Sequence, residues 1–469
     1  MPSGQRRLRS SIISGKNIVD LFGKNKKLGL GLAVLCLVAL AVAAALFLLF
    51  EMEKPQVNIA DDLSVLGAKR DLRFTVSDKR SGIQSITILL TQNDKKSELY
   101  QKSFPRQGYS FHAGPNQLEE TIVVDSRSLG LKDGLASLLF TVRDFSLWGW
   151  LKGNETVLEI PVTVDMTPPQ ITLIDATRYI APGGSGVVVY RLQEPTTVHG
   201  VMVNGNFNPG FPVTDGRDGK FVAFIGLAYD TVKLEKTLIT ASDKAGNQGT
   251  TGFVMNLLPA KAKSDRINIS DDFLNTKMPE FMQYYPEMTG TPVEQYLYIN
   301  NKIREKNSEQ IKEICGKTAP ERLWQGIFGR MPGSTKAGYA DHRTYYYQDK
   351  EIDRQVHLGI DLAGTSRMPA KAANSGKVAF VGYLGIYGNT VIIDHGQGLF
   401  SLYSHLSQID VAVDTPTTRD TVIGLSGLTG MAGGDHLHFA ILVNGVFVTP
   451  IEWWDPHWLK VSVEDQLSR

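Results

Sequence analysis

Short runs in which apolar and polar residues alternate dominate the chain from about residue 55 to residue 258. Strands that bury one face alternate in this way, because successive side chains point to opposite sides of the pleat. Gly, Asp, Asn and Pro interrupt the runs, of which the clearest occupy 71–78, 85–90, 138–144, 186–192 and 220–227. Many short strands separated by turns are typical of β-sandwiches, so the pattern predicts a mainly β protein.

This β-rich part contains a weak internal repeat. PQVNI at residue 55 and PQITL at residue 169 open two segments of similar size, and each segment ends on a strand followed by a polar turn. Thr-Pro-Pro at 167–169 is typical of a stiff linker, because proline fixes φ and restricts the residue before it. We therefore expect two β-sandwich modules, at 55–166 and 167–258.

The second module resembles bacterial immunoglobulin-like (Ig-like) modules through its Thr-Pro-Pro start and the turn Asp-Lys-Ala-Gly-Asn near its end. The first module resembles them less clearly. The resemblance implies two Ig-like spacers, or binding surfaces for other proteins of the cell envelope.

Between about 259 and 325 apolar residues recur at helical rather than alternating spacing. Charged residues fill the intervening positions, so the segment predicts one or two amphipathic helices. The apolar positions are Tyr296, Ile299, Ile303, Ile311 and Ile314. We expect a helical linker that leads into the last domain, and it could also cover the cleft of that domain.

An uncharged apolar run of 23 residues occupies 28–50. As a helix at ~1.5 Å per residue it covers about 35 Å, enough to cross a hydrocarbon core of ~30 Å. Basic residues predominate in 1–27, so the positive-inside rule places 1–27 in the cytoplasm and the bulk of the chain outside it, on the periplasmic or cell-wall side. A cleaved signal peptide is the alternative, but the long basic region and the length of the run favour a retained single-pass anchor.

Composition adds little to this organisation. At 469 residues the chain is long enough for several domains, and its net charge of +1 predicts no nucleic-acid partner. Of the two cysteines, Cys36 lies in the apolar run and Cys315 in the helical segment, so we expect no intramolecular disulfide. An exported chain without disulfides is compatible with a bacterial envelope protein.

Candidate chemistry is concentrated after residue 326, where the chain becomes β-like again. Of the nine histidines, five lie between 357 and 438. His-Glu-x-x-His is absent, which excludes a helix-borne zinc site, and Gly-x-Ser-x-Gly is absent as well. Cys315 lies outside the cluster, so a metal site fits the pattern better than a nucleophile does.

The segment GGDHLHFAILVNGVFVTP, from residue 433, predicts a strand and a hairpin turn at Asn444-Gly445. His436 and His438 then share one face with alternate residues and point into a cleft, while the opposite apolar face enters a core. A catalytic zinc site needs three protein ligands. His357 and Asp361, in RQVHLGIDLA, complete such a set with one histidine of the pair, and the other histidine can accept a proton beside the metal.

At these residues the chain resembles a known family. HLGIDLA, LYSHLS and GLTGMAGGDHLHF, in this order, are similar to the lysostaphin/LytM-type zinc endopeptidases of peptidoglycan (the M23 family), over about 355–450. The resemblance implies one Zn²⁺ per chain, with His357, Asp361 and His438 as ligands. It implies that His405 and His436 move the proton and stabilise the tetrahedral intermediate. It also implies a peptidase domain at 326–456, a mostly antiparallel β fold with a long groove.

Three neighbouring residues are interpreted differently. We expect His395 to be a structural turn residue and His342 a surface residue, with Arg343 a candidate for the groove. Asp435 stands where the family often has proline. It predicts a solvated loop residue or, as the alternative, a carboxylate that orients an imidazole.

The predicted function is zinc-dependent hydrolysis of peptide cross-links in peptidoglycan, with D-alanyl-diaminopimelate bridges first and glycine bridges second. Either His405 or His436 could be the general base. Two alternatives belong to other classes: a catalytically silent relative that activates cell-wall amidases, and an envelope scaffold or adhesin. The silent activator predicts a missing zinc ligand or proton-transfer residue, and this sequence has all five. In the scaffold or adhesin the β modules matter most, and the last domain only binds glycan.

Overall fold

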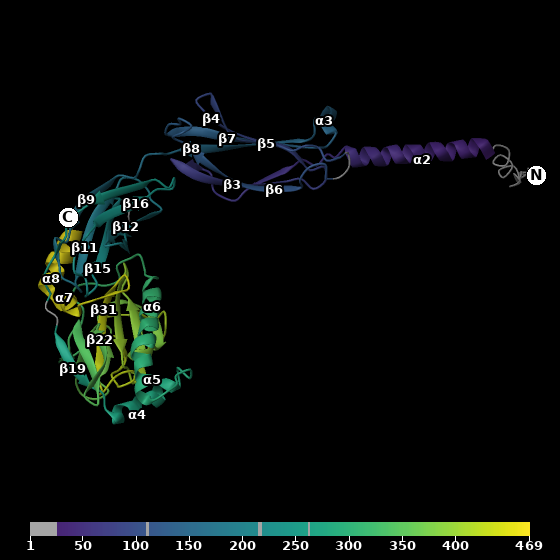
Figure 1. Ribbon diagram of the computed structural model, residues 1–469. Helices are drawn as coiled ribbons and strands as arrows, with labels where there is room; N and C mark the ends of the chain where they lie inside the picture. The colour runs from purple at the N-terminus through teal and green to yellow at the C-terminus, as the bar shows by residue number, and fades with distance from the viewer. Residues whose placement is uncertain (1–25, 109–111, 214–217, 261–262) are drawn as a thin grey trace, which may run out of the picture. The chain divides into compact units, whose positions relative to one another are not determined.

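The computed structural model describes residues 26–108, 112–213, 218–260 and 263–469, so most of the predicted cytoplasmic segment 1–27 lies outside the described residues. The protein is mainly β, as the alternating pattern predicts, and Figure 1 shows the order of its elements. It divides into two compact units, Met1–Met166 and Thr167–Arg469.

The first unit begins with one long apolar helix, α2 (Lys26–Leu49). Its stretch Gly29–Phe47 has a mean hydropathy of 2.8, and none of it is buried in the protein. The helix therefore has the length and composition of a membrane span or of an N-terminal signal sequence.

The rest of the first unit is a pair of sheets around one core. Leu72, Phe74, Ile86 and Phe140 are buried in this core. In β4 (Ile83–Gln92) buried and half-buried residues alternate, as the sequence predicts. One sheet has the order β1-β3-β6 and the other has the order β2-β8-β7-β4-β5. The bounds of the other strands are β1 (Gln56–Ile59), β2 (Val65–Leu66), β3 (Lys69–Ser77), β5 (Lys95–Ser103), β6 (Gln117–Asp125), β7 (Gly134–Asp144) and β8 (Glu155–Val164). A short helix, α3 (Trp148–Leu151), follows β7.

The second unit begins with two four-stranded sheets of orders β14-β15-β11-β9 and β13-β12-β16-β17, and a small β10-β18 pair. In β11 (Ser185–Leu192) both faces are buried. Val188 and Tyr190 enter the core between the two sheets, whereas Val187 and Val189 enter a second core that extends into the last domain. The remaining bounds are β9 (Ile171–Ala176), β10 (Tyr179–Ile180), β12 (Val198–Val203), β13 (Asn206–Pro209), β14 (Phe211–Pro212), β15 (Lys220–Gly226), β16 (Thr237–Ser242), β17 (Gln248–Gly252) and β18 (Asn256–Leu257).

A large sheet of order β20-β23-β31-β27-β26-β25-β29, with β32 beside β31, forms the centre of the last domain. All its strand pairs are antiparallel among the described residues. The bounds are β20 (Ser334–Ala337), β23 (Ile360–Ala363), β25 (Gly376–Tyr383), β26 (Asn389–Asp394), β27 (Leu399–Ser404), β29 (Pro416–Thr417), β31 (Leu437–Val443) and β32 (Val446–Val448). A smaller sheet, β24-β30-β28, contains β24 (Pro369–Lys371), β28 (Gln408–Ile409) and β30 (Val422–Leu425).

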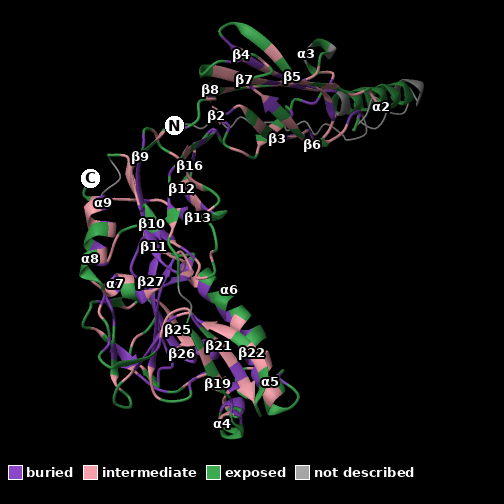
Figure 2. Cartoon of the chain, turned by 60° about the vertical axis from the view of Figure 1, so that its left-hand side comes forward, coloured by how far each residue is buried: buried purple, intermediate pink, exposed green. Residues whose placement is uncertain are grey.

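The central strand β31 separates two cores. Leu437, Phe439, Ile441 and Val443 lie in one core, and Ala440 and Leu442 lie in the other. The alternation predicted for this strand is therefore confirmed, but the expected cleft is confined to its first residues, because helices cover the face that carries Ala440 and Leu442. Figure 2 shows the neighbouring strand β27 among the buried parts of the unit.

The covering helices come from the segment predicted to be helical. They are α4 (Asp271–Met282), α5 (Pro292–Tyr298), the π-helix η1 (Ile299–Ile303) and α6 (Arg304–Cys315). Their starts follow the sequence: the Ser270 hydroxyl accepts from the Phe273 N–H, and Thr291 forms a capping box with Glu294. Tyr296, Ile299, Ile303 and Ile311 are buried in the second core, as their spacing predicts.

The same segment also contains a strand that the helical pattern did not predict. β19 (Ser264–Asn268) pairs in parallel with β21 (Asp341–Tyr347), which pairs with β22 (Lys350–His357). The chain closes with α7 (Pro450–Trp454), α8 (Pro456–Leu459), η3 (Lys460–Glu464) and α9 (Asp465–Leu467), and a 3₁₀ turn, η2 (Gly385–Tyr387), precedes β26.

Candidate active site

Strand register brings the predicted ligands together. Asp361 in β23 lies directly opposite His438 in β31, and His357 is the last residue of β22. The β31–β32 hairpin fixes the end of β31: Asn444 and Gly445 have φ of 50° and 79°, as the predicted turn requires, and Val443 pairs with Val446. Three residues that are far apart in the sequence thus meet at one place.

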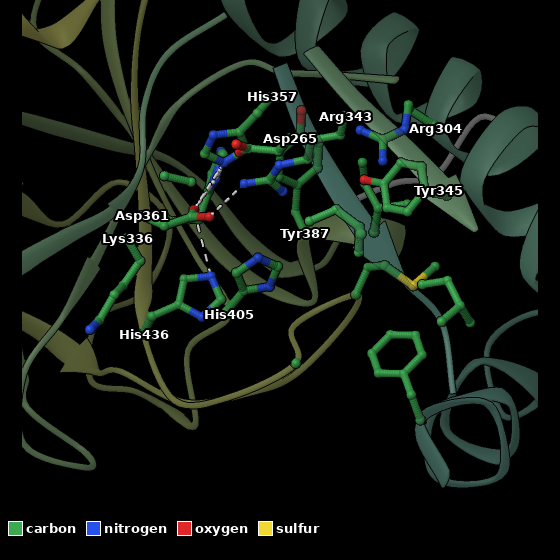
Figure 3. A pocket seen from close by; sticks show the side chains of 18 of the residues that line it. Asp265, Arg304, Lys336, Arg343, Tyr345, His357, Asp361, Tyr387, His405 and His436 are labelled. Carbon is green, nitrogen blue, oxygen red and sulfur yellow. Dashed lines mark hydrogen bonds and ion pairs between the residues drawn. The ribbon is translucent and has the colours of Figure 1, made fainter. Parts of the chain in front are cut away.

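Their donor atoms converge on one point. The Nε2 of His357 and the Nδ1 of His438 each lie 2.9 Å from the Oδ1 of Asp361, and the two nitrogens lie 2.9 Å from each other. All three side chains are buried, and together they form a group that could hold a metal ion. Figure 3 shows His357 and Asp361 of this group. Two imidazole nitrogens and one carboxylate oxygen are the donor set of many catalytic zinc sites.

The surroundings of His357 prepare its Nε2 to bind a cation. Its Nδ1 lies 2.8 Å from the carbonyl oxygen of Gly338. Because a carbonyl only accepts, Nδ1 carries the proton, and Nε2 keeps the lone pair that a metal needs.

Glycine at position 359 makes room for the ring of His438. A Cβ there would lie 2.4 Å from Cε1 and 2.5 Å from Nε2 of His438. This Nε2 is buried and has no hydrogen-bond partner among the described residues, an arrangement that fits an imidazole held through Nδ1 instead. The site therefore fits a metal ion both in its donors and in the space left for them.

His405 and His436 lie beside this group. Their ring centroids are 4.8 Å apart, and the His405 centroid lies 5.8 Å from that of His438. The Nδ1 of His405 donates to the carbonyl of Thr429 at 2.8 Å, and the Nδ1 of His436 donates to the carbonyl of Gly434 at 2.7 Å. In His405 Nε2 is the nitrogen that remains able to accept a proton, whereas Nε2 of His436 lies 3.5 Å from Oδ1 of Asp361.

The backbone at His405 supports a functional assignment. His405 follows the end of β27 and has a φ of 61°, which side chains with a Cβ rarely adopt. Its N–H donates to the carbonyl of Tyr387 at 2.9 Å, which holds this conformation in place. Unusual backbone of this kind often accompanies functional sites.

Burial and neighbouring charges set the protonation of the site. Burial raises the pKa of Asp361, but His357 and the other imidazoles outweigh it and hold that pKa well below its usual range. Burial lowers the pKa of His438 to about 4, and burial, followed by the charge of His436, holds the pKa of His405 well below its ordinary value. For His436 the hydrogen bond to Asp361 outweighs burial and raises the pKa. The site thus favours an ionised carboxylate and neutral imidazoles at His405 and His438.

Cationic side chains surround the group in a pocket of about 530 Å³. Arg343, which the sequence indicated as a groove residue, donates from Nη2 to Oδ2 of Asp361 at 3.1 Å. Arg304 from α6 and Lys336 from β20 line the same pocket, with Asp265 as an additional acid (Figure 3). Sequence reasoning missed Arg304 and Lys336, because nothing local in the sequence signals that their elements reach the site.

The other histidines and Asp435 lie elsewhere. His395 is buried, with Nδ1 2.7 Å from the Ser375 carbonyl and Nε2 2.7 Å from the Ser401 hydroxyl. His342 is exposed. Asp435 accepts from the hydroxyls of Ser366 and Ser426, at 2.8 and 2.6 Å, so it joins two loops and does not orient an imidazole.

An antiparallel β domain with a buried His–Asp–His group and two further histidines in its pocket defines a domain of metallopeptidase type. Residues 355–450 match the model of Peptidase family M23. The chain therefore carries an M23 peptidase domain, and the resemblance found in its motifs is confirmed.

Two curated relatives illustrate the extent of this similarity. The DD-carboxypeptidase/endopeptidase Mpg of Neisseria meningitidis serogroup B is 39% identical over 97 residues, which are 21% of this chain and 22% of the relative. The peptidoglycan DD-endopeptidase ShyA of Vibrio cholerae is 29% identical over 159 residues, 33% of this chain and 34% of the relative. The matched segments thus span about a fifth to a third of the length of these relatives.

Solved structures of similar chains include a putative peptidase M23 from Pseudomonas aeruginosa. It is 21% identical, with a TM-score of 0.39, and the match covers 59% of this chain and 95% of that chain. The catalytic domain of lysostaphin from Staphylococcus simulans is 28% identical, with a TM-score of 0.23, over 26% of this chain and 92% of that chain.

Proposed function

We propose that this chain is a zinc-dependent endopeptidase that hydrolyses peptide cross-links of bacterial peptidoglycan. The observation that carries the proposal is the convergence of His357, Asp361 and His438 on one point, with His405 and His436 beside them. Several relatives are named as peptidoglycan DD-endopeptidases, which supports this substrate class.

In this proposal Nε2 of His357, Oδ1 of Asp361 and Nδ1 of His438 hold one Zn²⁺. When bound, zinc supplies Lewis acidity: it polarises the scissile carbonyl and makes water acidic enough to attack near neutral pH. Arg343 keeps the second oxygen of Asp361 occupied at 3.1 Å, so Oδ1 stays turned toward the two imidazoles.

His405 and His436 are the proton-transfer residues of the proposal. Each is fixed through Nδ1 to a backbone carbonyl, so each presents Nε2 to the pocket. One of them takes the proton of the attacking water at Nε2 and passes it to the departing amine, and the Nε2–H of a protonated imidazole stabilises the charge that develops on the carbonyl oxygen.

The preferred bond is the one between D-alanine and diaminopimelate. Peptide stems with diaminopimelate carry several carboxylates, and the pocket offers Arg304 and Lys336 in addition to Arg343, which pairs with Asp361. Charge complementarity of this kind selects a partner and speeds its association. Glycine bridges lack these carboxylates and are the second choice.

We further propose that residues 28–50 hold the enzyme at the membrane, with the peptidase domain outside the cytoplasm. The helix α2 has the length and hydropathy that such an anchor needs, and peptidoglycan lies on that side of the membrane.

Digestion of purified sacculi by the full-length chain, followed by muropeptide chromatography, tests the proposal. We expect wild type and the control His457→Ala, whose side chain is exposed on α8, to convert cross-linked dimers to monomers. His438→Ala and chelator-treated wild type should release none. Equal traces from wild type and His438→Ala would refute enzymatic action and favour a silent activator or a scaffold.

A further inference from the structure

A second cluster of buried acidic side chains lies in the first unit and has no part in the proposed catalysis. Glu51, Asp78 and Asp144 are 2%, 3% and 0% exposed. One carboxylate oxygen of each lies within 4.8 Å of those of the other two. Carboxylates are rarely buried unless they are paired or bind a metal, so a cluster of three requires an explanation.

The three residues come from separate parts of the unit. Glu51 follows the end of α2, Asp78 follows β3, and Asp144 is the last residue of β7. The two aspartates also organise their own turns: Oδ1 of Asp78 accepts from the Gly82 N–H at 2.6 Å, and Oδ1 of Asp144 accepts from the Asn154 N–H at 2.7 Å.

A turn in the second unit shows how much of this arrangement is structural. There Oδ1 of Asp243 accepts from the Asn247 N–H at 2.9 Å, and the Asn247 amide donates to Oδ2 of the same aspartate at 2.9 Å. Asp144 and Asn154 make the same two contacts, at 2.7 and 2.8 Å. Among the described residues, however, Asp243 belongs to no acidic group of this kind. Turns therefore explain Asp144 and Asp78, whose Oδ1 accepts from the N–H groups of Arg80 and Gly82, but they do not explain the burial of Glu51 beside these two carboxylates.

One carboxylate oxygen of Glu51 is left without a hydrogen-bond partner among the described residues. Its Oε2 accepts from the Ser81 N–H at 2.9 Å, but its Oε1 is buried and has no hydrogen-bond partner within the described part of the chain. Within that part, no lysine or arginine forms an ion pair with any of the three carboxylates. Burial, followed by the charge of Asp78, raises the pKa of Glu51, which agrees with an uncompensated site.

We propose that Glu51, Asp78 and Asp144 bind a Ca²⁺ ion. All the donors are oxygens, which excludes the nitrogen and sulfur chemistry that zinc prefers, and calcium tolerates the irregular geometry of ligands from separate loops better than Mg²⁺ does. The unpartnered oxygen of Glu51 gives the ion a buried ligand that the protein itself leaves unused. The ion fastens the residues that leave α2 to two turns of the sandwich, and it acts independently of the peptidase site.

Equilibrium dialysis with radioactive calcium tests this proposal on the full-length chain in detergent. The protein is first dialysed against EGTA and then given one equivalent of Zn²⁺. Wild type should bind about one Ca²⁺ per chain, in the range of about 10⁻⁴ to 10⁻³ M or tighter that oxygen-ligand modules outside the cell show. Glu51→Gln and Asp78→Asn should bind Ca²⁺ at least about tenfold more weakly, because each loses one ligand charge.

Two controls separate the proposal from its rivals. Asp243→Asn removes a charge from the matching turn of the second unit and should bind Ca²⁺ as wild type does. His438→Ala should also keep its Ca²⁺, so failure of the peptidase proposal and failure of this one are distinguishable. Ca²⁺, and not Mg²⁺, should raise the unfolding temperature of wild type, a readout that does not depend on the folding of any variant. Absence of bound Ca²⁺, an equal response to Mg²⁺, or undiminished binding in both Glu51→Gln and Asp78→Asn would overturn the calcium site.

Discussion

Replacement of Gly359 by alanine tests whether the position of the His438 ring controls the site. The new Cβ would lie 2.4 Å from Cε1 and 2.5 Å from Nε2 of His438, and 2.8 Å from the carbonyl oxygen of Phe439. Carbon atoms in contact are separated by about 3.5–4.0 Å, so the ring has to move by roughly 1 Å or more. The backbone itself allows alanine, because the φ of Gly359 is not in the left-handed region.

A displaced ring carries Nδ1 of His438 away from Oδ1 of Asp361, from which it is now 2.9 Å distant. A misplacement of about 1 Å can lower the rate about 10²-fold, so we expect Gly359→Ala to release muropeptides about 10²-fold more slowly than wild type. Zinc affinity, measured by competition with a chromophoric chelator, should fall about 10- to 100-fold, as it does when the support of a ligand is removed.

Gly252→Ala is the matched control for this substitution. Position 252 lies in β17, and its added Cβ would meet only Cδ2 of Leu238, at 3.9 Å. It should keep wild-type rate and zinc affinity. Wild-type values for Gly359→Ala as well would show that the ring does not need this space, and the proposed geometry of the site would be wrong.

Three further predictions follow from the structure. His405→Gln and His436→Gln should each keep about one zinc per chain but lose about 10²–10⁴-fold in kcat, and loss of zinc from both would show that they are ligands instead. Burial raises the folded-state pKa of Glu452 to about 7 from 4.5, so its protonated form stabilises the fold at low pH, and this contribution is lost as the pH rises through 7. At pH 8 the free energy of unfolding of Glu452→Gln, measured in urea, should therefore exceed that of wild type by up to about 3 kcal/mol. At pH 4.5 the two free energies should differ little. An equal difference at both pH values would contradict this assignment. Phe224→Ala should destabilise the second unit by about 3–5 kcal/mol in urea unfolding, whereas Val232→Ala, at a position 87% exposed, should change it by less than about 0.5 kcal/mol.

The local features of the fold could be predicted from the sequence. Alternation located the strands of both β-rich segments, and helical spacing located the buried positions Tyr296, Ile299 and Ile303. The β31–β32 hairpin followed from Asn444-Gly445, because few residue pairs adopt positive φ twice. These features can be predicted because they depend on residues that are close together in the sequence.

The features that depend on distant pairings could not be predicted in the same way. β19 has the sequence SDRIN, which lacks an apolar face, and it is a strand only because β21 offers an edge for parallel pairing. The site itself was indicated by motifs, but the pairing of Asp361 with His438 and the contact of Arg343 with Asp361 arise from register between separate strands. The type of a residue indicates that it could be a site residue, whereas the pairing of strands in the sheet determines which of these residues lie close together.

Strand β11, in residues 167–258, carries a sequence signal of burial on both faces. GVVVYRL contains four consecutive apolar residues, which are typical of a strand buried on both faces rather than of a strand in an isolated spacer. In the structure Val187 and Val189 share a core with Trp324 and Trp453, while Val188 and Tyr190 enter the core of the module itself. The ring of Phe224 lies 6.2 Å from Trp324 and 6.3 Å from Trp453, measured between centroids.

The core shared by β11 and the last domain means that residues 167–258 support the sheet of the candidate site. Trp453 belongs to α7, and its indole donates to the Ser185 hydroxyl at 3.0 Å, while Glu452 accepts from the Ser185 N–H at 2.7 Å. A fragment that begins at residue 326 would leave one face of this core in water, at a cost of roughly 25 cal/mol for each Å² of apolar surface exposed. A fragment that keeps this core intact therefore includes 167–469, and residues 167–258 are part of the scaffold that holds the sheet carrying Asp361 and His438.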